Sequence, residues 1–387
     1  MGFLDRFDEF HERAIVAAGH DDFGITDYVE PLRRLLADYD DEGRIVGQGA
    51  ELAAADIVGK LAGRLFVERG FRDHPEYLDQ PIEKPIVIIG MPRSGTTALQ
   101  RLIASDPNMQ ALELWLGATP MPRPPRIEWE SHPAYRAFVT GFEALMALNP
   151  RITAIHPLFP DQPEECRGVI DQSFWATSLA ATRTVPAYRD WTIAADARFA
   201  YRWYRRALGL IAGGDKRRWV LKMPDHIFGL DALLDIFPDA CIVHPHRSLL
   251  RSMPSVCSLS HEVLRLVEPD RSKRDHGAYV WPYWARGMEK AEEARRKADP
   301  ARFFDLHSDE IRRDTVGALE RIYAHFDIPV TEEARVAWQD RIAADPNSSH
   351  LPHHYTLEEW SLSPERIHAE TPLYSERYQS LYGENER

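Results

Sequence analysis

The stretch that decides the fold is Pro85-Ile86-Val87-Ile88-Ile89-Gly90-Met91-Pro92-Arg93-Ser94-Gly95-Thr96-Thr97. It opens with an apolar, mostly β-branched run that ends at a glycine, which is typical of a strand buried on both faces of a sheet. Leu99, Leu102 and Ile103 then predict one apolar face of a helix, which Asp106-Pro107 ends. The stretch therefore predicts a strand, a glycine-containing turn and a helix.

Four more segments carry short apolar runs of the kind that forms buried strands. They are Met109 to Leu112, Trp219 to Leu221, Ala240 to Val243 and Phe303 to Leu306. Apolar residues at helical spacing lie between or after them: Ile227, Leu230 and Leu234 in one segment, and Val316, Leu319, Ile322 and Tyr323 in another. Strands that alternate with helices predict an α/β fold with a P-loop-like parallel sheet flanked by helices.

The rest of the chain reads as additions to this core. Residues 1–80 predict a helical N-terminal extension, with Ile57, Leu61 and Leu65 on one helical face. The α/β core covers residues 81–330 and contains a helical insertion at about 115–212, which is irregular and rich in proline and aromatic residues. Residues 331–387 predict a polar and aromatic C-terminal tail that packs on the core.

Composition narrows the class of protein. The chain has 387 residues and a formal net charge of −13, which argues against a nucleic-acid surface because phosphate neutralisation needs a basic face. Its three cysteines (Cys166, Cys241 and Cys257) are widely spaced, so a disulfide framework or a cysteine-rich metal site is not expected. No apolar window is long enough to span a bilayer. We expect a cytoplasmic protein without bound metal. The sequence leaves open whether the protein forms a homo-oligomer.

The turn from Gly90 to Thr97 has the chemistry of an anion cradle. Backbone N–H groups at such a turn, together with a helix N-terminus, bind phosphate-like groups. Gly95 allows the backbone to approach a ligand closely, and the hydroxyls of Thr96 and Thr97 can donate to the same oxygens. A turn whose glycines serve packing alone is the alternative, and the added Arg93 and Ser94 favour anion binding.

The same turn departs from a nucleotide-triphosphate loop. Gly90 and Gly95 have the spacing of a Walker A sequence, but Thr96 stands at the position of the Walker lysine. An ATPase needs that lysine on the terminal phosphates and magnesium in the site. The only cation inside this turn is Arg93. The sequence therefore predicts a phosphate-like ligand rather than magnesium-bound ATP.

The segment Pro92-Arg93-Ser94-Gly95-Thr96-Thr97 resembles the 5′-phosphosulfate loop of the sulfotransferase superfamily, within it a bacterial branch similar to protein-tyrosine sulfotransferases. The resemblance covers about residues 79–330. It implies 3′-phosphoadenosine 5′-phosphosulfate (PAPS) as sulfuryl donor and 3′-phosphoadenosine 5′-phosphate (PAP) as product. Arg93, Ser94, Gly95, Thr96 and Thr97 would then bind the donor.

The resemblance also implies a second anchor for the donor. In this family an arginine after a strand binds the 3′-phosphate, and a serine eight residues later assists it. Arg247 follows the run Ala240 to Val243 closely, and Ser255 comes eight residues after it. Arginine can make paired hydrogen bonds to a phosphate. Pro254 predicts that the helix carrying Ser255 starts late or bends. A surface ion pair is the alternative role for Arg247.

Two residues are candidates for the base that takes the acceptor proton. Glu113 has the spacing after Asp106-Pro107 that the resemblance gives to the catalytic glutamate of protein-tyrosine sulfotransferases, and we favour it. A carboxylate that only forms a salt bridge at a strand end is the alternative. His156 is the second candidate, because small-molecule sulfotransferases of this superfamily use histidine and its pKa suits a base.

Lys222 matches the lysine that contacts the transferring group in this family, so the resemblance implies that it stabilises charge there, with Arg93 as a second cation. A lysine that snorkels from a strand end into solvent is the alternative. Arg93, Glu113, Lys222 and Arg247 each come just after a predicted strand. Ligands of open parallel sheets bind outside the carboxyl ends of the strands. The shared placement therefore supports one site made of these residues.

The acceptor and the reaction class follow less directly. Aromatic residues of the insertion, and the acidic net charge, favour transfer to a hydroxyl or amine of an apolar small molecule or lipid over a charged polysaccharide. A P-loop kinase or nucleotide hydrolase is one alternative, against which the missing lysine counts. A non-catalytic PAPS-binding protein is the other, against which the presence of Glu113 and Lys222 counts.

Overall fold

The computed structural model describes residues 1–344 and 355–382. The chain forms two compact units. Unit 1 comprises Met1–Ile82, Leu112–Lys216 and Leu259–Arg271, and unit 2 comprises Glu83–Ala111, Arg217–Ser258 and Ser272–Arg387. The boundaries predicted from the sequence at 80, 115–212 and 330 stay a prediction, and part of the predicted tail lies outside the described residues.

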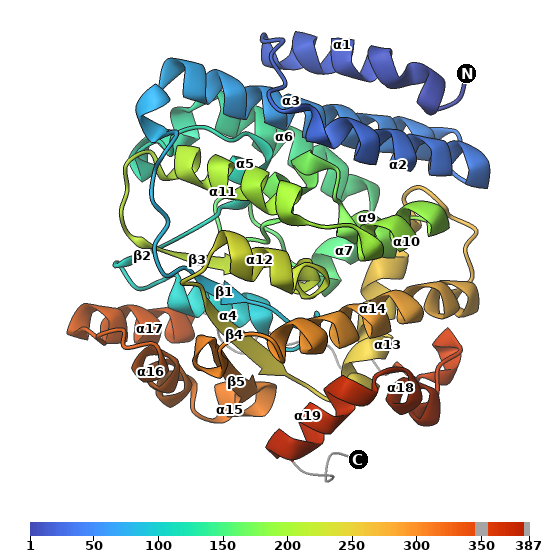
Figure 1. Cartoon of the computed structure of the whole chain (residues 1–387). Helices are drawn as coiled ribbons and strands as arrows, with labels where there is room; N and C mark the ends of the chain where they lie inside the picture. Colours follow the sequence, from blue (N-terminus) through green and yellow to red (C-terminus); the bar gives the residue numbers. More distant parts are fainter. Residues whose placement is uncertain (345–354, 383–387) are drawn as a thin grey trace. The chain divides into compact units, whose positions relative to one another are not determined.

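Unit 2 contains a five-stranded parallel sheet in the order β2-β3-β1-β4-β5. Each strand lies in a segment predicted from its apolar run, so the predicted fold class is confirmed. The strands are β1 (Ile86–Ile88), β2 (Met109–Ala111), β3 (Arg218–Lys222), β4 (Cys241–His246) and β5 (Phe303–His307), labelled in Figure 1.

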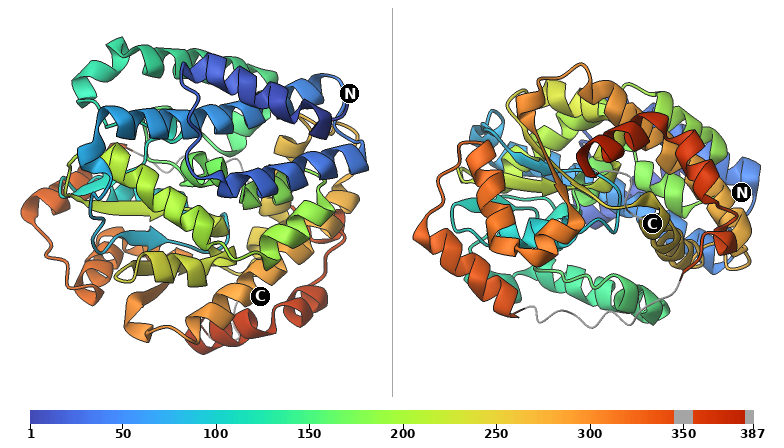
Figure 2. Two further views of the ribbon diagram at one scale, coloured as in Figure 1. Left: turned by 45° about the horizontal axis from the view of Figure 1, so that its top comes forward. Right: turned by 90° about the horizontal axis from the view of Figure 1, so that it is seen from below.

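Helices cover both faces of this sheet. On one face, Ile86 and Ile88 share a core with Leu99 of α4, Leu319 of α16 and Trp338 of α17. On the other, α14 contacts α12 and α19 (Figure 2). The helices of unit 2 are α4 (Thr96–Ile103), α12 (Leu230–Ile236), α14 (Lys273–Arg295), α15 (Ser308–Arg313), α16 (Thr315–His325), α17 (Glu332–Ala344), α18 (Pro364–Glu370) and α19 (Pro372–Tyr382).

Two sequence expectations about helices need correction. Ile227 does not share a helix with Leu230 and Leu234, because it lies in a 3-10 turn, η6 (Pro224–Phe228), which Gly229 separates from α12. The helix that carries Ser255, α13 (Leu249–Leu264), does not start late, since it begins before Pro254 and includes it. Pro254 is the sixth residue of α13, beyond the first four N–H groups that have no helical partner, so the helix continues through it with the hydrogen bond to Leu250 missing.

Unit 1 is helical and has a core of its own. That core joins Leu35 of α2 and Leu61 of α3 to Leu179 of α9 and Tyr188 of α10, so the N-terminal segment and the insertion share apolar packing. Arg64 of α3 is fully buried in this unit, where its guanidinium lies over the ring of Trp203 at 3.8 Å. The helices of unit 1 are α1 (Phe7–Ala18), α2 (Val29–Glu42), α3 (Gln48–Asp73), α5 (Leu114–Ala118), α6 (Pro133–Leu148), α7 (Pro150–Ile155), α8 (Arg167–Ile170), α9 (Thr177–Thr182), α10 (Pro186–Ala194) and α11 (Arg198–Ala212).

The described part of the chain contains no helix both long enough and apolar enough to cross a membrane.

Candidate donor and catalytic site

The turn between β1 and α4 adopts a backbone that glycine makes accessible. Gly90 has φ of +110° and Gly95 has φ of +91°, both in the left-handed region. A side-chain carbon at Gly90 would lie 2.7 Å from Cδ2 of His244, so the strand β4 leaves no room for one. Arg93 also has a positive φ, +71°, which is uncommon for a residue with a side chain and marks local strain.

The N-terminus of α4 completes this turn. Gly95 is the N-cap, and Thr96 and Thr97 are the first two helical residues. The first N–H groups of a helix have no partner within the helix and carry partial positive charge. The Ser94 hydroxyl donates to the backbone oxygen of Met91 at 2.7 Å and so closes the turn from inside. The turn therefore has the strand, glycine and helix-start geometry that the sequence predicts, and its binding of an anion stays a prediction.

Arg93, Arg247 and Ser255 come together in unit 2. Arg93 Nε donates to Ser255 Oγ at 3.2 Å, and Arg247 Nη1 donates to the backbone oxygen of Arg93 at 2.9 Å. Arg247 directly follows β4, and Ser255 lies in α13. The two anchors that the sequence analysis treats separately are thus joined by direct hydrogen bonds.

The electrostatics around Arg247 point to an anion. Burial lowers the pKa of Arg247, and the cations Arg312, Arg93 and Arg251 lower it further against a smaller opposing effect of Asp309. Burial also lowers the pKa of Arg93. Like charges held this close repel each other, and a negatively charged ligand is the simplest way to offset the repulsion.

Lys222 ends β3 beside β1. Its Cα pairs with that of Ile88, and its residue is fully buried. A buried ammonium group is costly unless it is paired, so this position is unlike that of an ordinary surface lysine. β3, β1 and β4 are parallel neighbours, and their carboxyl ends meet at one edge of the sheet. Lys222, Arg93 and Arg247 therefore belong to the same edge.

Glu113 lies in unit 1, two residues beyond the end of β2. The segment that carries it pairs with residues 160–164: Leu114 donates to Gln162 at 3.2 Å, and Glu164 donates to Leu112 at 2.9 Å. The Glu113 carboxylate forms an ion pair with Arg123, with Oε2 and Nε 3.2 Å apart. The segment around Pro163 thus holds the backbone of Glu113.

His156, the second candidate base, also lies in unit 1. It directly follows α7, and its backbone N–H donates to Ile152 at 2.8 Å. Its side chain is partly buried.

The comparisons with known proteins identify the family. Residues 85–332 match the sulfotransferase family, and the chain belongs to it. The resemblance drawn from the loop is therefore confirmed at the level of the family, and family membership implies a sulfuryl donor.

Particular relatives are mycobacterial. The chain is similar to the crystal structure of the sulfotransferase STF1 from Mycobacterium tuberculosis H37Rv, with 36% identity, a TM-score of 0.86 and coverage of 94% of this chain and 97% of that one. It is also similar to the sulfotransferase STF9 from Mycobacterium avium, with 26% identity, a TM-score of 0.87 and coverage of 97% and 96%.

A curated relative is the omega-hydroxy-beta-dihydromenaquinone-9 sulfotransferase Stf3 of Mycobacterium bovis, 25% identical over 276 residues. The match covers 63% of this chain and 62% of the relative's length.

Two features of the site were not predicted from the sequence. Arg123, the ion-pair partner of Glu113, lies in a proline-rich segment without a regular spacing of apolar residues. His244 and His246 alternate along β4, which places both side chains on one face of the sheet. That alternation was a usable signal, although what the two rings contact depends on strands and helices distant in the sequence.

Gly90→Ala tests the turn. We expect the free energy of unfolding to fall by about 1–3 kcal/mol, because alanine must adopt a positive φ and its Cβ meets His244. Urea unfolding followed by circular dichroism measures this change. The control is Gly59→Ala in α3, where a Cβ meets nothing within 4 Å and about 0.5–1 kcal/mol should be gained. A Gly90→Ala protein as stable as wild type would contradict the account.

Proposed function

We propose that this protein transfers a sulfuryl group from PAPS to a hydroxyl of an apolar acceptor and releases PAP. The observation that carries the proposal is the joined pair Arg93 and Arg247, whose charges accumulate beside the N-terminus of α4. The start of α4 and the pair of Arg247 and Ser255 would supply two sets of donors, as a nucleotide with phosphates at both its 5′ and 3′ positions requires.

The residues fit such a donor. The N–H groups and hydroxyls of Thr96 and Thr97 would hold the 5′-phosphosulfate at the start of α4. Arg247 would bind the 3′-phosphate through its guanidinium, with Ser255 as an added hydroxyl donor. Arg93, which already bonds to Ser255, lies where it can neutralise charge on either group.

The chemistry needs a base and a cation. Glu113 takes the proton of the acceptor hydroxyl as the acceptor oxygen forms its bond to sulfur, and the bond between sulfur and the bridging phosphate oxygen breaks. Lys222 and Arg93 stabilise the negative charge that develops on the leaving phosphate. The ion pair with Arg123 would orient the Glu113 carboxylate before the acceptor arrives.

The acceptor class rests on the relatives and on composition. Stf3 is named for a menaquinone derivative with a terminal hydroxyl, which is a lipid. Unit 1 of this chain is rich in aromatic side chains, among them Trp115, which packs edge-on against Trp129 and Tyr135 in the segment that follows Glu113. We therefore propose a lipid-like alcohol as acceptor.

Ligand binding separates this proposal from a kinase or nucleotide hydrolase. PAP alone should raise the melting temperature by several degrees, since ligand at about 100 times its Kd adds about 2.7 kcal/mol of stability. ATP with Mg²⁺ should raise it less, because no lysine stands after Gly95. Differential scanning fluorimetry measures both shifts. Stabilisation by ATP only when Mg²⁺ is present would overturn the proposal.

Activity measurements separate the two candidate bases and the non-catalytic alternative. With labelled PAPS and a long-chain alcohol or phenol acceptor, Glu113→Gln should lower kcat by about 10²–10⁴-fold, since it removes the proton acceptor and preserves the shape. His156→Gln is the matched variant and should stay within a few-fold of wild type. The reverse pattern would assign the base to His156. A wild-type protein that binds PAP and transfers no sulfate to any acceptor of a broad panel would be a binding protein.

A further inference from the structure

We propose that a largely buried polar network, running from helix α19 through Asp305 and His246 to His244, positions the first residue of the donor loop, Gly90. His244 and His246 are positioning residues in this account, and Arg377 and Tyr374 connect them to α19. The inference rests on the proposed function, because its consequence is a change in affinity for the nucleotide. Every residue of this polar network belongs to unit 2.

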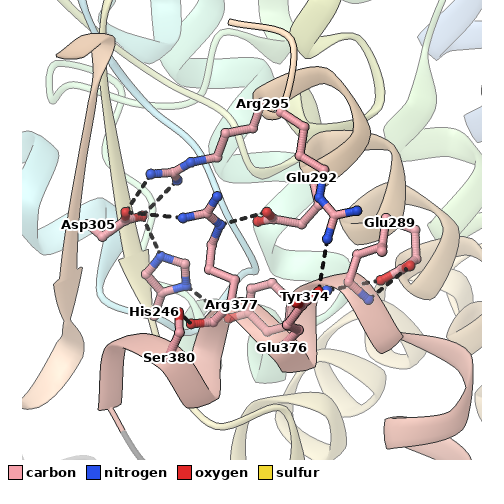
Figure 3. Close-up of polar contacts among 11 residues, drawn as sticks. His246, Glu289, Glu292, Arg295, Asp305, Tyr374, Glu376, Arg377 and Ser380 are labelled. Atoms are coloured by element: carbon pink, nitrogen blue, oxygen red, sulfur yellow. Dashed lines mark hydrogen bonds and ion pairs between the residues drawn. The ribbon is translucent and has the colours of Figure 1, made fainter. Parts of the chain in front are cut away.

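The centre of the polar network is Asp305 on β5. Its Oδ1 accepts from Arg295 Nη1 at 2.7 Å and from His246 Nε2 at 2.8 Å, and Arg295 also contacts Oδ2 (Figure 3). Arg377 of α19 lies 3.8 Å from the same carboxylate and donates from Nε to Glu292 at 2.6 Å. Although burial acts the other way, the contacts with His246 and Arg295 hold the pKa of Asp305 well below its usual range.

The carboxylate fixes the orientation of His246. Burial lowers the pKa of His246 despite its bond to Asp305, so the ring is neutral at pH 7. Because Asp305 only accepts, Nε2 carries the proton, and Nδ1 is left to accept from the Tyr374 hydroxyl at 3.1 Å. Asp305 and Tyr374 thus hold the two edges of one ring, and α19 is bonded through Tyr374 to the end of β4 (Figure 3).

His246 in turn supports His244. The centroids of the two rings are 4.0 Å apart with their planes tilted by 30°, and His244 is 2% exposed. Burial and the neighbouring His246 keep the pKa of His244 well below its ordinary value, so this ring is also neutral. Asp305 is its register partner on β5. A shift of the His246 ring would therefore displace His244.

His244 lies directly against the donor loop. A side-chain carbon at Gly90 would be 2.7 Å from its Cδ2 and 2.9 Å from its Nε2, so the ring occupies the space that a side chain at Gly90 would need. Arg247, three residues later, bonds to the backbone of Arg93. The end of β4 thus contacts the loop at two points, under Gly90 and at Arg93.

A metal site is the other reading of these groups, because His244, His246 and Asp305 bring three potential ligand atoms within 4.8 Å of one another. The surroundings disfavour a cation. Asp305 already faces the guanidinium groups of Arg295 and Arg377, and both nitrogens of His246 are engaged in hydrogen bonds. Bound metal would have to displace those bonds and stand beside two positive charges.

The test disrupts the α19 end of the polar network, which is the end distant from Gly90, and measures donor binding. Arg377→Gln breaks the contacts to Glu292 and Asp305 without altering any residue assigned to the donor or acceptor. We expect the Kd for PAP, measured by isothermal titration calorimetry, and the KM for PAPS to rise about five- to twentyfold. The KM for the acceptor should change less than twofold. Arg377→Lys, which keeps the charge beside Asp305, should restore at least half of the lost affinity on a logarithmic scale.

The matched control is Arg296→Gln. Arg296, the residue after α14, also contacts α19, through Glu376 at 2.9 Å, but both side chains are more than half exposed and lie outside the polar network to His244. The Kd of the Arg296→Gln protein for PAP should equal that of wild type within twofold. Tyr374→Phe serves if Arg377→Gln fails to fold, since it removes one hydroxyl only, and it should raise the Kd two- to fivefold.

Two results would overturn the inference. One is a folded Arg377→Gln or Tyr374→Phe protein that binds PAP as wild type does. The other is an equal loss of affinity in Arg296→Gln, which would show that any loosening of α19 has the effect. A wild-type protein that does not bind PAP would instead refute the proposed function.

Discussion

The concentration of positive charge around Arg247 is the constraint on which the proposed site depends. Arg247 bonds to the carbonyl of Arg93, whose φ is positive and strained, and burial together with the charges of Arg312, Arg93 and Arg251 lowers the pKa of Arg247. Partial burial strengthens the repulsion, since solvent screens it less. A folded protein tolerates such an arrangement where function requires it, and an anionic ligand offsets it. The sheet, the turn at Gly90 and the start of α4 all contribute to placing these two charges.

The parallel sheet brings these groups together from distant parts of the sequence. β1, β3 and β4 are neighbours, so residues at their carboxyl ends meet although more than a hundred positions separate Arg93 from Lys222. The charged network around Asp305 connects β4 and β5 to α14 and α19. Support of this kind matters because a loop that binds phosphate through backbone N–H groups depends on the position of its backbone to within fractions of an ångström.

Local patterns in the sequence predicted much of this structure. The strand, turn and helix around Gly90 were readable because β-branched residues, glycines of positive φ and apolar helical spacing act within a few residues of one another. The 3-10 turn at Ile227 was misread as helix, since its apolar spacing is the same and only Gly229 signals the break. The ion pair of Glu113 with Arg123, and the stacking of His244 under Gly90, depend on tertiary geometry that no local pattern encodes. The donor roles of Thr96, Arg247 and Ser255 stay predictions.

The account's central claim is that Arg247 and Ser255 recognise a 3′-phosphate while the loop binds the 5′ end of the same nucleotide. Calorimetric titration of PAP and of AMP, into wild type and into an Arg247→Gln, Ser255→Ala double variant, tests it as a thermodynamic cycle. Wild type should bind PAP about ten- to a hundredfold more tightly than AMP, as a charged hydrogen-bond pair of about 1.5–3 kcal/mol implies. The double variant should lose most of that preference, whatever happens to its affinity for AMP. Equal affinity of wild type for PAP and AMP, or a preference that survives in the double variant, would contradict the account.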